Sequence, residues 1–155
     1  MLTIGDIAPD FALPDQNGNL VTLDQLVARG QTVIYFYPAD FTPVCTREAC
    51  AFRDRYDDLQ RLSVPLVGIS PQGVESHKRF AAAHRLPFPL LADETKEAVR
   101  AFGVSGPLGF GVRRATFLVD QDKRIVNRAV SDLFIGGHLE LVSKVLEKPP
   151  SAARS

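Results

Sequence analysis

The strongest constraint on the fold is a change from a strand pattern to a helix pattern between residues 32 and 60. Residues 32–37 (TVIYFY) are β-branched or aromatic, as in a buried strand. Pro38 ends this run, and three residue types that favour turns and helix starts follow it: Asp40, Thr42 and Pro43. Apolar side chains then recur at steps of three and four residues, as on a helix with one buried stripe: Cys45, Ala49, Phe52, Tyr56 and Leu59. The sequence therefore predicts a buried strand that leads directly into a helix ending near residue 62.

The rest of the chain alternates between strand and helix patterns. Two prolines and the Asn17-Gly18 turn predict a hairpin of short strands within the first 25 residues. Further extended segments are predicted at residues 64–70, 88–91, 115–119 and 124–130. Helices are predicted at 74–84, 95–102 and from Gly136 to about 147, and the inner side of the first is predicted to hold Val74, Phe80, Ala81 and Ala83. This order predicts an α/β protein of thioredoxin-like architecture, with a mixed central sheet flanked by helices and an N-terminal β-hairpin extension.

Length and composition limit the classes of function. A chain of 155 residues with 45% hydrophobic residues is predicted to form one domain over residues 1–148, followed by a flexible tail at 149–155. Eighteen basic and eighteen acidic residues cancel, which argues against binding to nucleic acid or to a membrane surface. No export leader is apparent after Met1, so we expect a cytoplasmic protein in a reducing compartment.

No metal or other cofactor is expected from the candidate ligand residues. His77 and His84 are two helical turns apart, about 10 Å, and His138 lies on another element, so the histidines are predicted to have ordinary surface or helix-end roles. Residues 103–111 (GVSGPLGFG) are predicted to be a loop. They lack the Lys-Ser/Thr pair of a phosphate-binding loop and the flanking strand and helix of a dinucleotide site.

The two cysteines of the chain, Cys45 and Cys50, fall at the start of the predicted helix after residue 42. Unpaired backbone N–H groups and the positive end of the helix dipole favour a thiolate at such a position. In an intact helix, residues five apart have Cα atoms about 8.6 Å apart, whereas a disulfide needs about 4.4–6.8 Å. A disulfide between these cysteines therefore requires the helix start to unwind. A permanent structural disulfide is disfavoured, while a transient disulfide and two unrelated buried cysteines both stay open.

Several segments resemble the peroxiredoxin family. Pro38-x-x-x-Thr42-x-x-Cys45 matches the signature of that family, and Glu48 and Cys50 are similar to the bacterioferritin comigratory protein subgroup, also called peroxiredoxin Q. Three further segments read like the same family: GDIAPDFALPDQNG, VGISPQGVESHKRF and RRATFLVDQDKRIV. The resemblance implies a thiol-dependent peroxidase that reduces hydrogen peroxide and organic hydroperoxides. It further implies reduction by a thioredoxin-like partner and, in this subgroup, a monomer.

The resemblance also implies roles for individual residues. Cys45 is expected to be the peroxidatic nucleophile, Cys50 the resolving thiol that forms an intramolecular disulfide with it, and Arg114 the activating cation. Arg113 competes with Arg114, but strand alternation places the two on opposite faces.

Other residues near Cys45 have expected roles in holding the peroxide. Thr42 is expected to offer its hydroxyl to the peroxide, Val44 its backbone N–H, and Pro38 a rigid cap over the pocket. A carboxylate at Glu48 opposes ionisation of Cys45, so we expect Glu48 to orient Arg114 and not to act as a base.

Three alternative functions are compatible with parts of this pattern. A one-cysteine peroxidase would leave Cys50 idle. A non-enzymatic redox sensor would use the same unwinding to expose a surface for a partner protein. A disulfide reductase of the thioredoxin type is disfavoured because the sequence lacks a C-x-x-C pair.

Overall fold

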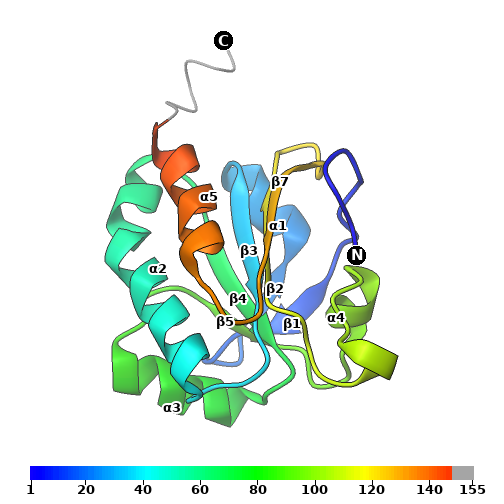
Figure 1. Ribbon diagram of the computed structural model, residues 1–155. Coiled ribbons are helices and arrows are strands. Elements are labelled where there is room, and N and C mark those ends of the chain that lie inside the picture. Colours follow the sequence, from blue (N-terminus) through cyan, green and yellow to red (C-terminus); the bar gives the residue numbers. More distant parts are fainter. Residues whose placement is uncertain (148–155) are drawn as a thin grey trace.

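A computed structural model describes residues 1–147 of the chain (Figure 1). Its centre is a mixed five-stranded sheet in the order β5-β4-β3-β6-β7. The strands are β3 (Thr32–Phe36), β4 (Leu66–Ser70), β5 (Leu90–Ala92), β6 (Ala115–Val119) and β7 (Ile125–Val130). β3 pairs in parallel with β4 and antiparallel with β6, so the sheet changes direction beside its central strand.

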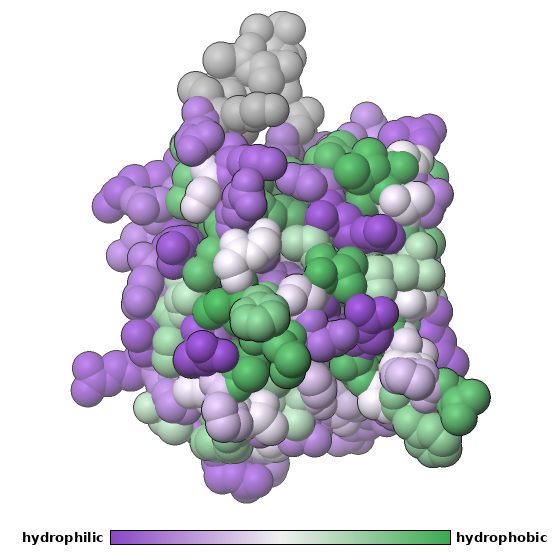
Figure 2. Space-filling view, in the orientation of Figure 1, coloured by the Kyte–Doolittle hydropathy of each residue, from purple (hydrophilic) through white to green (hydrophobic). Residues whose placement is uncertain are grey.

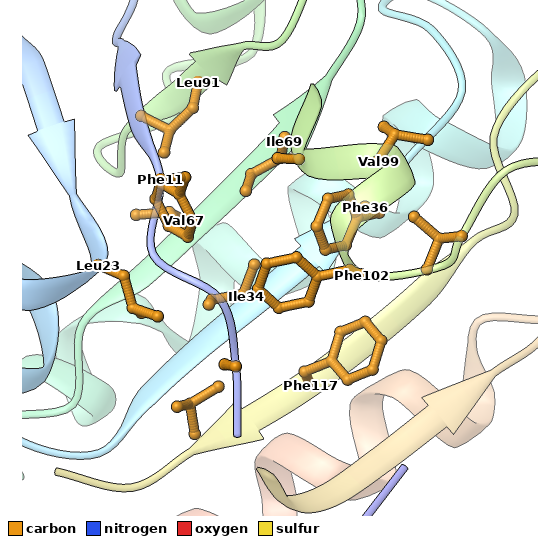
Figure 3. Close-up of a cluster of buried hydrophobic side chains, with 14 of the residues drawn as sticks. Phe11, Leu23, Ile34, Phe36, Val67, Ile69, Leu91, Val99, Phe102 and Phe117 are labelled. Atoms are coloured by element: carbon orange, nitrogen blue, oxygen red, sulfur yellow. The ribbon is translucent and has the colours of Figure 1, made fainter. Parts of the chain in front are cut away.

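Helices cover both faces of the sheet, and each face has its own hydrophobic core (Figure 1). Three helices cover one face: α2 (Pro43–Arg61), α3 (Val74–His84) and α5 (Gly136–Glu147). The opposite face is covered by α1 (Leu23–Arg29), α4 (Glu97–Ala101) and residues of the N-terminal segment. Figure 3 shows this second core, where side chains from sheet, helices and N-terminal segment meet, among them Phe11, Leu23, Ile34, Phe36 and Phe102. The predicted fold class is therefore confirmed.

The three inner strands are mostly apolar because every residue in β3, β4 and β6 is buried. Gly68 illustrates how tightly side chains of neighbouring strands pack within the sheet. A Cβ atom added to Gly68 on β4 would lie 2.8 Å from the ring of Tyr35, its neighbour on β3. Gly68 thus makes the space that the Tyr35 ring occupies.

The strand that leads into α2 is also confirmed, and so is the buried stripe of α2. Its outer side carries hydrophilic side chains, which Figure 2 shows along the left of the molecule. The N-terminal hairpin consists of β1 (Ala12–Pro14) and β2 (Leu20–Thr22). Within residues 1–147 no helix combines the length and apolar character needed to cross a membrane.

Several details differ from the sequence-based expectation. Helix α1 was not predicted, although Thr22 and Gln25 form a capping box at its start. On α3 the predicted inner residue Ala83 is exposed, and His77 lies on the buried face instead. The short helical turn Pro107–Gly109 lies within the predicted loop 103–111. The predicted tail at 149–155 and the domain end at residue 148 lie outside the described residues.

Candidate active site

Cys45 lies in the first turn of α2, just beyond the carboxyl end of β3, and only 1% of its surface is exposed. Thr42 occupies the N-cap position, with extended backbone angles, and Pro43 is the first helical residue. Within the described residues the Thr42 side chain makes no capping hydrogen bond and instead donates to the carbonyl oxygen of Ala39 at 3.2 Å. The backbone N–H groups at the helix start, including those of Val44 and Cys45, are therefore not occupied by this side chain.

Arg114 brings a buried positive charge to the sulfur. It directly precedes β6, and 3% of its surface is exposed. Its Nη2 donates to Cys45 Sγ at 3.2 Å, and its Nη1 donates to Glu48 Oε1 at 2.7 Å. The carbonyl oxygen of Asp132 accepts from Arg114 Nε at 3.2 Å and fixes the third side of the guanidinium. Arg113 points away and pairs with the Asp132 carboxylate at 2.9 Å.

Glu48 is completely buried one helical turn after Cys45. Burial raises the pKa of Glu48 to about 7, although Arg114 acts in the opposite direction. Burial also acts to lower the pKa of Arg114, but Glu48 and Cys45 outweigh it and the pKa of Arg114 rises. The guanidinium is therefore charged under all ordinary conditions and is shared between a carboxyl group and a thiol.

His138 lies beside Glu48 and Thr116 contacts His138, and the sequence did not identify either of them as a site residue. Glu48 Oε2 has no hydrogen-bond partner among the described residues, and His138 Nδ1 lies 3.9 Å from it. Thr116 Oγ1 is 2.7 Å from His138 Nδ1, and His138 Nε2 is 3.0 Å from the carbonyl oxygen of Ser131. Because a carbonyl only accepts, Nε2 carries the proton and Nδ1 accepts from Thr116. Burial lowers the pKa of His138, which favours this neutral form.

The predicted roles of two histidines were wrong. His138 is fully buried beside Glu48. His77 is also fully buried, and its Nδ1 lies 2.8 Å from Asp40 Oδ2 in the turn before α2. Nothing in the spacing of the histidines indicated these partners, because the partners come from other elements. Within residues 1–147 there is no group of three or more His, Cys, Asp or Glu side chains placed to hold a metal ion.

The second thiol is on the same helix as the first. Both cysteines are free thiols, and Cys50 is half-buried within the continuous helix α2. Five residues of ideal helix separate Cα atoms by about 8.6 Å, beyond the range of a disulfide. The structure therefore brings together Cys45, Arg114 and Glu48, and it keeps Cys50 apart from them. Pro38 is half-buried at the end of β3, and Thr42 is exposed at the start of α2.

The chain is similar to known proteins over most of its length. Residues 4–128 match the AhpC/TSA family. Peroxiredoxin Bcp of Escherichia coli K12 is 40% identical over 154 residues, which cover 95% of this chain and 97% of the relative. The crystal structure of peroxidoxin BcpB from Mycobacterium tuberculosis superposes with a TM-score of 0.88 at 36% identity and covers 100% of both chains.

A structure of the Xanthomonas campestris bacterioferritin comigratory protein, described for its alkyl peroxide reduction activity, is 29% identical with a TM-score of 0.80. The match covers 88% of this chain and 90% of that one. A matching family model over most of the chain and a full-length relative at 40% identity lead to one conclusion. The chain belongs to the AhpC/TSA family and is a peroxiredoxin, a thiol peroxidase similar to the Bcp and Q proteins.

Proposed function

We propose that this peroxiredoxin reduces hydrogen peroxide and organic hydroperoxides with Cys45 as the nucleophile and Cys50 as the resolving thiol. The Cys45 thiolate attacks one oxygen of the peroxide, the O–O bond breaks, and the other oxygen leaves with a proton as water or alcohol. The sulfur becomes a sulfenic acid. The contact that supports this assignment is the 3.2 Å hydrogen bond from Arg114 to Cys45 Sγ.

Two groups favour a thiolate at this position. Arg114 donates a charge-assisted hydrogen bond to the sulfur, and its charge is held in a buried site where water screens it little. The start of α2 adds unpaired N–H groups and the positive end of the helix dipole. Arg114 can serve this role because Glu48 and the Asp132 carbonyl fix its orientation. Glu48 is therefore proposed as a positioning residue for Arg114.

The proposed peroxide site lies at the start of α2. The N–H groups of Val44 and Cys45 can donate to the peroxide oxygens, and they stabilise the negative charge that develops on the leaving oxygen. The Thr42 hydroxyl donates to the carbonyl oxygen of Ala39 and keeps its own oxygen available to accept a hydrogen bond from the bound peroxide. Pro38 offers no backbone N–H and is half-buried where it can limit water around the sulfur.

Resolution is proposed to proceed by unwinding the start of α2. The Cys50 thiol then attacks the Cys45 sulfenic acid, a disulfide forms and water leaves. Because both sulfurs belong to one chain, the cycle requires no second subunit, and a monomer is sufficient. The disulfide becomes exposed when the helix unwinds, so a thioredoxin-like dithiol can reduce it by exchange. The alkyl peroxide activity named for the X. campestris protein supports organic hydroperoxides as substrates.

A coupled assay with thioredoxin, its reductase and peroxide tests the proposal. Wild type should consume peroxide steadily at catalytic concentration, and Cys45→Ser should be inactive. Cys50→Ser should react once and stop as a sulfenic acid, which mass spectrometry detects after trapping. Unchanged turnover of Cys50→Ser would instead establish a one-cysteine peroxidase. The absence of steady consumption by wild type with any dithiol would favour the redox-sensor function.

A further inference from the structure

A buried cluster outside the reaction centre holds the turn that precedes α2. The Asp40 carboxylate is its hub, and its side chain is completely buried. Oδ1 accepts from the hydroxyl of Tyr37 at 2.7 Å, and Oδ2 accepts from the hydroxyl of Ser76 at 2.7 Å. His77 Nδ1 lies 2.8 Å from Oδ2. Ser76 and His77 belong to α3, so the cluster ties the turn before α2 to a neighbouring helix.

His77 ties the same cluster to a third segment. Its Nε2 lies 3.1 Å from the carbonyl oxygen of Leu91 on β5, and its Nδ1 also lies 3.3 Å from the Tyr37 hydroxyl. Burial acts to raise the pKa of Asp40, but hydrogen bonds from His77, Tyr37 and Ser76 outweigh it and the pKa is lowered. A buried carboxylate is thus held by three side chains, and leaving it without these partners is costly.

The cluster opposes strain in the same turn. Phe41 directly follows Asp40 and has φ +66°, which places a bulky residue in the left-handed region. The Phe41 ring is half-exposed and packs edge-on against Phe80 of α3 at 5.1 Å between centroids. On the other side of Phe41, the carbonyl oxygen of Thr42 accepts from Thr46 in the first turn of α2 at 2.8 Å. The turn is therefore an unfavourable conformation that Asp40 holds in place next to the cysteine helix.

We propose that Asp40 is a positioning residue that controls how long the start of α2 stays folded after Cys45 is oxidised, and so selects the fate of the sulfenic acid. This inference rests on the proposed resolution by Cys50. While the turn is held, the Cys45 sulfenic acid is out of reach of Cys50 and meets only a second peroxide. That peroxide transfers one oxygen to the sulfur, which becomes a sulfinic acid, and leaves as water or alcohol. When the turn is released, Cys50 displaces water and forms the disulfide.

The test compares Asp40→Asn with wild type in single-turnover experiments. Asparagine keeps the size of the side chain and one oxygen acceptor, but it replaces the other carboxylate oxygen by an amide group that cannot accept. After one equivalent of hydrogen peroxide, disulfide formation should be about tenfold faster, since a hydrogen bond to a charged group contributes on that order. With excess peroxide, the sulfinic fraction should fall by a similar factor. The rate of the first peroxide reaction should fall, because the folded start of α2 that binds peroxide is populated less.

Opposite changes in these two rates separate positioning from a general loss of structure, which would slow both. Ser76→Ala removes one of the hydrogen bonds to Asp40 and keeps the contacts of Tyr37 and His77, so it should accelerate disulfide formation less, about threefold. If Asp40→Asn does not fold, the rate of disulfide formation in Ser76→Ala alone tests the role of the Asp40 cluster. Asp58→Asn is the matched control, because Asp58 pairs with Arg61 on the exposed far end of α2 and should behave as wild type.

Disulfide formation that is unchanged or slower in the cluster variants would overturn the role of Asp40. If wild type formed no Cys45–Cys50 disulfide, the proposed resolution by Cys50 would fail instead. The two failures are therefore distinguishable by mass spectrometry of the quenched wild-type reaction.

Discussion

Replacing Glu48 by glutamine should remove a large pH dependence of stability. The pKa of Glu48 is about 7 in the folded protein, against 4.5 for an unperturbed glutamate. At pH below 4.5 the carboxyl group is protonated in both folded and unfolded chains. As pH rises from 4.5 to 7, only the unfolded chain ionises, so this group contributes stability that is lost as pH rises through the folded pKa. The shift corresponds to about 3 kcal/mol of unfolding free energy between pH 4.5 and pH 8.

Urea unfolding of the reduced proteins from pH 4.5 to pH 8.5 measures the effect. The free energy of unfolding of wild type, minus that of Glu48→Gln, should fall by about 3 kcal/mol over this range. Titrating groups present in both proteins, such as Asp40, cancel in this difference. Glu140→Gln is the control, because Glu140 lies on the surface of α5 and pairs weakly with Lys144 at 3.7 Å. A difference that stays constant with pH would refute the claim that burial outweighs Arg114 at Glu48.

Three further substitutions test other contacts. Arg114→Lys keeps the charge but cannot contact Cys45, Glu48 and the Asp132 carbonyl together, so the second-order rate with peroxide should fall at least about tenfold. The thiolate absorbance at neutral pH should fall with it. Gly68→Ala should destabilise the protein by about 1–3 kcal/mol in urea, because its Cβ would lie 2.8 Å from the Tyr35 ring. Thr116→Val should cost about 1–3 kcal/mol in the same measurement, because His138 Nδ1 would lose its donor in a buried site.

The elements that the sequence predicted best are those with the strongest burial pattern. β3, β4 and β6 are buried at every residue, so their composition alone identified them. The stripe of α2 extends from Cys45 to Leu59, about four turns, and was equally clear. Helix α1 has only seven residues, too few to show a clear helical repeat of apolar residues, and it was not predicted. Its capping box, Thr22 with Gln25, was the available signal.

The sequence predicted the residues of the candidate site only where they belong to segments that resemble the family, such as Pro38-x-x-x-Thr42-x-x-Cys45. Strand alternation placed Arg113 and Arg114 on opposite faces, and the resemblance to the family pattern selected Arg114. The structure has Arg114 at the sulfur. The buried histidines were missed because a histidine's environment depends on acceptors from distant segments. His138 meets Ser131 across the loop before α5, and His77 meets Asp40 from 37 residues away. Sequence spacing within one helix contains no information about such partners.

The separation of 69 positions between Cys45 and Arg114 has a consequence for the protein during its synthesis. A nascent chain presents the cysteine helix long before β6 leaves the ribosome. Until β6 aligns with β3, the sulfur lacks its guanidinium partner and has the reactivity of a thiol at a bare helix end. Maturation of the reactive cysteine is therefore tied to completion of the sheet.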